Sequence, residues 1–97
     1  MTSIIEYVRY NIPADQAESF ITTFRLASPL LTAAPGCLGC ELRQGVENPA
    51  EFVARVVWSS IAAHVEFRES AEFPKFKGNF AGFEIVSLGH YEKVEMD

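Results

Sequence analysis

The sequence predicts an α+β fold, with helices covering one face of an antiparallel sheet. Segments with the alternation typical of strands occupy residues 3–12, 37–46, 51–58 and 83–95. Segments with helical spacing follow the first and third of these strands. The chain closes on the fourth strand, so the order is strand, helix, strand, strand, helix, strand. This is the βαββαβ order of ferredoxin-like domains, which form a four-stranded antiparallel sheet.

The first strand is expected over Ser3–Ile12, where alternate side chains point to opposite faces. Its even-numbered residues, which include Glu6, Val8 and Tyr10, are expected to face the helices. Pro13 ends the strand, because proline has no N–H to donate to a neighbouring strand.

The first helix is expected to begin at Asp15, with Glu18 at the capping-box position. Pro29 lies late in the helix, where it should kink the helix or split off a final turn. Apolar side chains recur at helical spacing and form an aromatic stripe that packs on the sheet: Ala17, Phe20, Ile21, Phe24, Ala27 and Leu31.

The second and third strands are expected to be joined by the turn residues Glu47-Asn48-Pro49. Gly36 suits the left-handed position that follows a helix, so the second strand begins directly after it, at Cys37. The third strand, Glu51–Trp58, is largely apolar on both faces, which predicts that both faces are covered.

The second helical region is expected over residues 61–69, with Ser60 as its N-cap. Ser70 is expected to cap a further short helix, which tolerates Pro74 only because this proline falls in its first turn. Three phenylalanines accompany that helix: Phe73, Phe76 and Phe80.

The composition limits the classes of function. A chain of 97 residues is expected to form a single domain over residues 1–97. Its formal net charge of −5, with scattered basic residues, argues against nucleic acids and anionic membranes as partners. The first residues lack the basic and apolar regions of a signal peptide, and no apolar run approaches membrane-spanning length. A cytoplasmic protein is therefore expected.

Cys37 and Cys40 form a CxxC motif, which elsewhere binds zinc or performs redox chemistry. Residues three apart in a strand face opposite sides, so these thiols are not expected to meet one metal ion. The sequence offers no second cysteine pair to complete a zinc site. Buried, reduced thiols and no bound metal are therefore expected.

A cavity is predicted where the third strand ends and the second helix begins. Trp58 ends that strand and His64 lies in the first turns of the helix, so the two side chains are expected to line one cavity. Its further walls are expected to come from neighbouring elements: Val8, Tyr10, Ala54 and Phe67. Glu6 faces the same way and would need a partner if buried. His90 is expected to have a structural role.

The opposite face of the sheet carries Ile5, Tyr7, Val53 and Val57. This face is too apolar to lie in water, and one layer of helices cannot cover it. A homodimer that pairs two sheets face to face is therefore expected.

The sequence resembles the antibiotic biosynthesis monooxygenase family over nearly its whole length. The similarity lies in PGCLGCEL, FVARVVWSSIAAHVEF, SAEFPKF and the closing HYEKV. It implies a dimeric α+β barrel without metal or organic cofactor. Members of the family oxidise polycyclic phenols or anthrones to quinones with O₂ as co-substrate.

The resemblance also suggests residue roles. Trp58 matches the pocket tryptophan of anthrone-oxidising members, so Trp58 and His64 are the candidate catalytic residues. His64 falls where those members carry a tyrosine, and Ala54 falls where they carry an asparagine. Histidine, with an ordinary pKa of about 6.5, could replace the tyrosine as proton acceptor.

Haem degradation, the activity of another branch, is not expected. The pocket asparagine, second-helix tryptophan and haem-ligating histidine of that branch fall at Val8, Phe67 and Lys77.

Three classes of function remain open. The first is a cofactor-independent monooxygenase acting on an aromatic polyketide or quinol. The second is another reaction on the same fold, such as an isomerisation or the processing of a signalling metabolite, with His64 as acid and base. The third is a dimer that binds an aromatic molecule without converting it.

Overall fold

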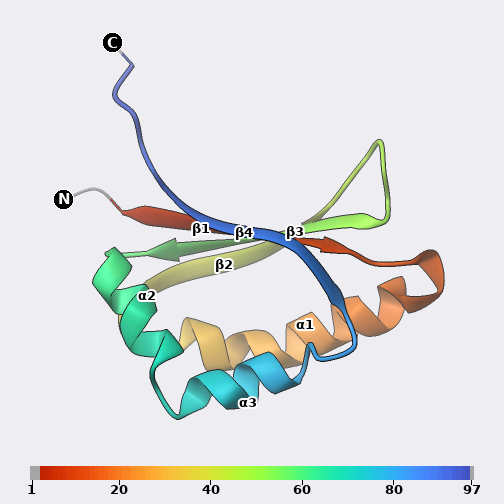
Figure 1. Ribbon diagram of the computed structural model, residues 1–97, viewed down its shortest axis with the longest axis horizontal. Coiled ribbons are helices and arrows are strands. Elements are labelled where there is room, and N and C mark those ends of the chain that lie inside the picture. The colour runs from red at the N-terminus through yellow and green to blue at the C-terminus, as the bar shows by residue number, and fades with distance from the viewer. Residues whose placement is uncertain (1–2, 97) are drawn as a thin grey trace.

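The computed structural model describes residues 3–96 and has the predicted ferredoxin-like architecture (Figure 1). A short 3₁₀ turn, Ala14–Gln16, precedes the first helix, and the second helical region consists of two helices. In chain order the main elements are β1 (Ile4–Asn11), α1 (Ala17–Thr32), β2 (Cys37–Gln44), β3 (Glu51–Trp58), α2 (Ile61–Arg68), α3 (Glu72–Gly78) and β4 (Glu84–Glu92).

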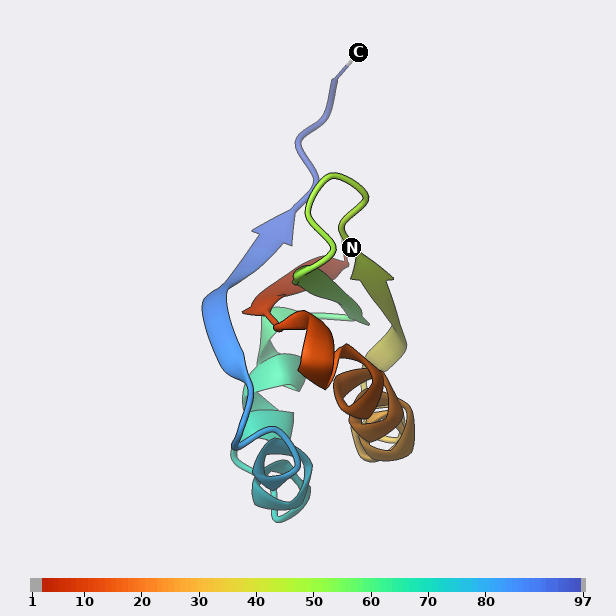
Figure 2. The ribbon, with the colours of Figure 1, turned by 90° about the vertical axis from the view of Figure 1, so that its right-hand side faces the viewer.

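The four strands form one antiparallel sheet in the order β2-β3-β1-β4. The helices lie on one face of this sheet, with α1 and α3 side by side (Figures 1 and 2). β2 and β4 form the two edges, which leaves β1 and β3 in the centre. Among the described residues, no helix has both the length and the apolar character needed to cross a lipid bilayer.

The alternation predicted for β1 and β3 is confirmed. In β1 the side chains of Glu6, Val8 and Tyr10 are buried on the helix-facing side, while Arg9 is exposed. In β3 every second residue is buried, ending in Trp58 with no exposed surface.

The apolar stripe of α1 is confirmed, since Phe20, Phe24, Ala27 and Leu31 are all buried. The predicted capping box at Asp15 is wrong. Asp15 lies in the 3₁₀ turn, α1 begins after it, and neither element has a side-chain cap hydrogen bond. The helix also runs through Pro29 without a break, because Ala33 N–H bonds to the Pro29 carbonyl and completes a final turn.

The start of α2 follows the prediction. The Ser60 hydroxyl accepts a hydrogen bond of 3.1 Å from the backbone N–H of Ala63, as an N-cap does. Gly36 has the expected left-handed backbone, with φ 84°, and its carbonyl accepts from Ser59 N–H. A side chain at Gly36 would also collide with Ala63, so glycine lets the end of α1 approach α2 closely.

The predicted cap of α3 is wrong. The hydroxyl of Ser70 donates a hydrogen bond of 2.7 Å to the carbonyl of Phe67. It therefore satisfies the end of α2, while Ala71 occupies the N-cap position of α3 without a side-chain bond. Phe80 follows α3 and is buried.

The sequence predicted that the two cysteines face opposite sides of the sheet, and this prediction is wrong. The register of β2 against β3 shifts between Cys37 and Gly39, so Cys37 pairs with Trp58 and Cys40 pairs with Val56. The extra residue of this bulge turns both thiols toward the helices. Both are half-buried and free of disulfides.

Candidate functional site

A cavity of about 290 Å³ lies between the central strands and the helices. The structure places all six predicted pocket residues around it: Val8, Tyr10, Ala54, Trp58, His64 and Phe67. Glu6, which was expected to face the same way, also lines the cavity. The remaining lining residues come from the helices, the segment that follows α3 and the sheet: Phe24, Leu31, Val56, Phe73, Phe76, Lys77, Phe80, Ile85 and Leu88. Most of the lining is apolar or aromatic, so the cavity suits a compact aromatic molecule.

The closed end of the cavity is built around the Glu6 carboxylate. Trp58 donates a hydrogen bond of 3.0 Å from Nε1 to Glu6 Oε1, and both side chains are buried. His64 Nδ1 lies 3.7 Å from the same oxygen. Glu6 thus has the partner that a buried carboxylate requires. Because Nδ1 faces the carboxylate, Nε2 is the nitrogen of His64 left for a ligand.

His90 completes this cluster, although only a structural role was expected for it. Its Nε2 lies 3.6 Å from Glu6 Oε2, and its ring packs against that of His64 in a tilted arrangement, with centroids 4.1 Å apart and planes inclined by 53°. In the sheet, His90 is the β4 residue directly opposite Glu6. The pairing of β1 with β4 brings these two residues together, and a strand order inferred for the predicted ferredoxin-like fold was the signal that could have found the contact.

The electrostatic environment of His64 favours the neutral imidazole. Burial lowers the pKa of His64 below its ordinary value, and His90 and Arg68 lower it further. The Glu6 carboxylate acts in the opposite direction but does not reverse the shift. At neutral pH His64 therefore has a free ring nitrogen, as a proton acceptor requires.

Tyr10 and Cys40, two further ionisable groups at or near the cavity, are poor bases or nucleophiles at neutral pH. Burial, with smaller contributions from Glu6 and Cys40, raises the pKa of Tyr10 well above its usual range. Burial also raises the pKa of the Cys40 thiol to about 12, with Cys37 adding to the effect. Tyr10 can therefore donate a hydrogen bond to a ligand, whereas His64 is the candidate base.

Glu6, His64 and His90 are also the residues that could hold a metal ion, since their ligand atoms lie within 4.8 Å of one another. Two imidazoles and one carboxylate suit zinc or ferrous iron. However, Glu6 Oε1 already accepts a hydrogen bond from Trp58 Nε1. Metal-binding histidines usually donate their second N–H to a fixed acceptor. Among residues 3–96, neither histidine ring makes such a hydrogen bond. The cluster fits a proton-transfer site better than a metal site.

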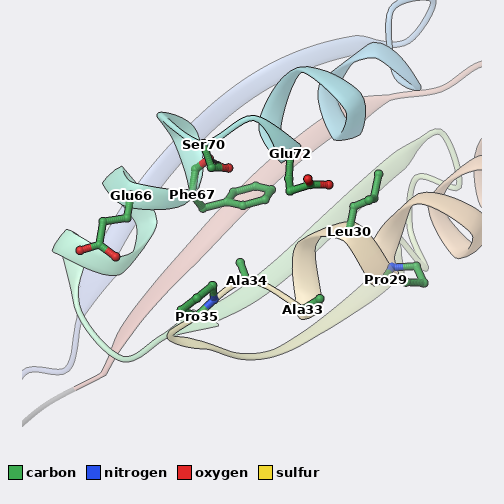
Figure 3. Close-up of a pocket in the computed structure, with 9 residues that line it drawn as sticks. All are labelled: Pro29, Leu30, Ala33, Ala34, Pro35, Glu66, Phe67, Ser70 and Glu72. Atoms are coloured by element: carbon green, nitrogen blue, oxygen red, sulfur yellow. Dashed lines mark hydrogen bonds between the residues drawn. The ribbon is translucent and has the colours of Figure 1, made fainter.

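A second hollow, of about 470 Å³, lies outside the cavity, between the end of α1 and the α2–α3 region (Figure 3). Its walls are mainly apolar, with Glu66 and Glu72 as its charged groups (Figure 3). Phe67 lines both hollows and therefore separates them. The outer hollow lacks a histidine, so the inner cavity is the better candidate for chemistry.

Comparisons with known proteins agree with the fold. A proposed antibiotic biosynthesis monooxygenase of Bordetella bronchiseptica has a TM-score of 0.88 at 28% identity, covering 98% of this chain and 100% of that one. SnoaB, a cofactor-independent oxygenase from Streptomyces nogalater, has a TM-score of 0.86 at 12% identity, covering 99% and 97%. A conserved protein from Methanosarcina mazei has a TM-score of 0.82 at 14% identity, covering 97% and 95%.

The last two likenesses, at such low identity, concern the fold alone. No protein of curated function matches the chain significantly. The sequence of residues 3–79 matches the family described as antibiotic biosynthesis monooxygenase, a span that includes β1, β3, α2 and every predicted pocket residue. The chain therefore belongs to the antibiotic biosynthesis monooxygenase family.

Proposed function

We propose that this protein is a cofactor-independent monooxygenase that oxidises a phenolic or quinol-type aromatic molecule of the polyketide class with O₂. The observation that supports the proposal is the placement of His64 in an apolar, aromatic cavity, backed by the buried carboxylate of Glu6. The apolar lining limits access of water, and Nδ1 of His64 lies 3.7 Å from the Glu6 carboxylate, which leaves Nε2 for the substrate in this proposal.

The chemistry needs little from the protein. His64 Nε2 accepts the proton of an enol or phenol whose keto form carries a CH₂ group. The resulting anion transfers one electron to O₂, and the substrate radical and superoxide combine to form a carbon–oxygen bond. His64 returns its proton to the peroxide. Loss of the remaining C–H proton and cleavage of the O–O bond then give a ketone and water, so CH₂ and O₂ become C=O and H₂O.

Trp58 and Tyr10 have supporting roles in this proposal. Trp58 fixes the orientation of Glu6 through its indole N–H. Tyr10, which stays protonated, offers a hydrogen-bond donor to the oxygen of the bound anion, where it stabilises developing charge. Val8, Ala54 and Phe67 shape the apolar walls.

Oxygen uptake with a panel of anthrones and hydroquinones tests the proposal. The native protein should consume one O₂ for each quinone formed from an anthrone. His64→Ala should lower kcat by roughly 10²-fold or more, the usual scale for a positioned base. Glu66→Gln is the matched control, because Glu66 lies on the exposed side of the same helix. Undiminished turnover in His64→Ala, or no oxygen uptake across the panel, would contradict the proposal.

A second candidate is a proton-transfer reaction such as isomerisation. The Glu6–His64 pair favours it, because a carboxylate-backed imidazole can move a proton without oxygen. Conversion of a substrate under anaerobic conditions would identify this reaction. Binding of the aromatic panel without turnover under either condition would indicate a ligand-binding protein.

We also propose that the protein acts as a homodimer. The sheet face opposite the helices carries Ile5, Tyr7, Val53 and Val57, which are only half-buried in the single chain. Pairing this face with that of a second copy would remove its apolar surface from water.

A further inference from the structure

Lys77 has an unusual position among the basic residues of this chain. Within residues 3–96 it is the only lysine or arginine that lines the inner cavity. It is exposed and lies near the end of α3, with Nζ 6.0 Å from the centroid of the Phe73 ring. No described carboxylate lies within ion-pair distance of Lys77, whereas Lys75 in the same helix pairs with Glu72 at 3.4 Å. The Lys77 ammonium group therefore remains able to bind an anion.

The two ends of the cavity differ in charge. Glu6, with 6% of its surface exposed, is the carboxylate at the closed end, next to His64. Lys77 is exposed, as are Ile85 and Leu88 of β4, so these three residues mark the open side. The remaining lining between these ends is apolar apart from the Tyr10 hydroxyl. A bound molecule thus meets a cation at the mouth and a carboxylate-backed imidazole inside.

We infer that the cavity takes an aromatic carboxylic acid, bound with its carboxylate at Lys77 and its ionisable hydroxyl at His64. This inference rests on the proposed function and specifies its substrate class. The reverse orientation would bury the ligand's carboxylate beside Glu6, where like charges repel strongly. The volume of about 290 Å³ lies at the small end of known ligand sites, so the acid is a compact one.

A favourable interaction with the dipole of α3 does not by itself explain why Lys77 lies at the cavity. A cation in the last turn of a helix interacts favourably with the helix dipole. Lys75 and Lys77 both lie in that turn of α3, so both can serve this purpose. Only Lys77 also lines the cavity, and this difference makes Lys75 a matched control.

The test uses a hydroxynaphthoic acid whose hydroxyl and carboxyl groups lie at opposite ends of the rings, together with its neutral methyl ester. Binding of each to the full chain is measured by calorimetry without oxygen, so that no turnover occurs. The native protein should bind the acid about tenfold more tightly than the ester, a difference of about 1.4 kcal/mol. Lys77→Met should remove this preference, and Lys75→Met should keep it. Added salt should weaken the preference, because the cavity mouth is exposed.

Equal affinity of the native protein for acid and ester would overturn the inference, as would an acid preference that survives Lys77→Met. Failure of both ligands to bind would also overturn it. Loss of the preference in Lys75→Met as well would mean that general surface charge is responsible. The outcome is separable from the proposed function: an acid preference without oxygen uptake would keep the inference and remove the oxygenase. Oxygen uptake by the native protein with no preference for acid over ester would remove the inference and keep the oxygenase.

Discussion

The indole N–H of Trp58 donates a hydrogen bond of 3.0 Å to the carboxylate of Glu6, and this bond joins β3 to β1 inside the cavity. Glu6 pairs directly with Val56, so Trp58 is its diagonal neighbour across the two strands. Long side chains can reach each other across such a diagonal. Neither residue is more than 6% exposed, so the bond is shielded from water. It orients the Glu6 carboxylate, whose oxygens lie 3.7 Å from His64 Nδ1 and 3.6 Å from His90 Nε2.

Trp58→Phe should destabilise the protein by about 1.5–3 kcal/mol through the lost hydrogen bond to a charged group, in addition to the effect of the smaller ring. The reason is that Glu6 keeps its burial and loses its only hydrogen-bond donor among residues 3–96. Denaturant unfolding measures the change. A double-mutant cycle with Glu6→Met, which removes the acceptor, isolates the pair from the change in ring size. Strict additivity of the two variants would mean that the bond contributes nothing to stability.

Glu6→Gln should move the acid limb of the pH–rate profile to lower pH. The Glu6 carboxylate raises the pKa of His64, while burial, His90 and Arg68 lower it, so removal of the negative charge lets the pKa fall further. Maximal kcat should also fall by about 10- to 100-fold, which does not exceed the fall in kcat expected when a positioned base is removed. Glu69→Gln, at the exposed end of α2, serves as the control. An unshifted limb would remove Glu6 from the catalytic arrangement.

Stability should decrease as the pH falls below about 6.5, the ordinary pKa of histidine, toward the lower pKa of folded His64. In that interval the unfolded chain binds a proton that the folded chain does not, so protonation favours unfolding. Above that interval the contribution is fully present. Denaturant unfolding across this pH range measures the slope, and His64→Gln should reduce it. The same slope in both proteins would show that His64 does not titrate as the site geometry implies.

Much of the site could be predicted from the sequence because it depends on strand alternation and on one helix start. The even-numbered positions of β1 and β3 place Val8, Tyr10 and Ala54 on one face whatever their detailed packing. The cap at Ser60 then sets His64 over the end of β3. These are local rules that a single sequence displays.

The errors arose where pairing between distant segments decides the geometry. His90 meets Glu6 only because β4 pairs with β1 in one particular register. The thiols of Cys37 and Cys40 share a face because of a bulge in the pairing of β2 with β3. The residues CLGC do not by themselves indicate that β2 contains a bulge. Similarly, the Ser70 hydroxyl bonds back to α2, although its sequence context equally suits a cap for α3.

Protein purified without added metal should contain substoichiometric zinc and iron. Glu6 Oε1 is already bonded to Trp58, and neither histidine ring has a second hydrogen bond within residues 3–96 to hold it as a ligand. Elemental analysis after dialysis is the measurement. One equivalent of either metal per chain, lost in His90→Gln, would instead establish Glu6, His64 and His90 as a metal site.

Charge substitutions on the outer sheet face should distinguish Val57 from Val53. Val57 pairs with Ile5 on one side and Gly39 on the other, so an aspartate there would have no neighbouring cation on the adjacent strands. Val53 lies between Arg9 and Arg43, which could partly neutralise an aspartate. If this face is the interface of a homodimer, a buried and unpaired charge at Val57 should be the more disruptive of the two.

Sedimentation should therefore show the native protein and Val46→Asp as dimers at micromolar concentration, since Val46 is 90% exposed in the loop between β2 and β3. Val57→Asp should be a monomer or unfolded, and Val53→Asp should dissociate at higher concentrations than the native dimer. The double variant should behave like Val57→Asp. A thermal melt separates dissociation from unfolding. Because one layer of helices leaves this apolar face uncovered, a native protein that sediments as a monomer would contradict the dimer, and the face would need another partner.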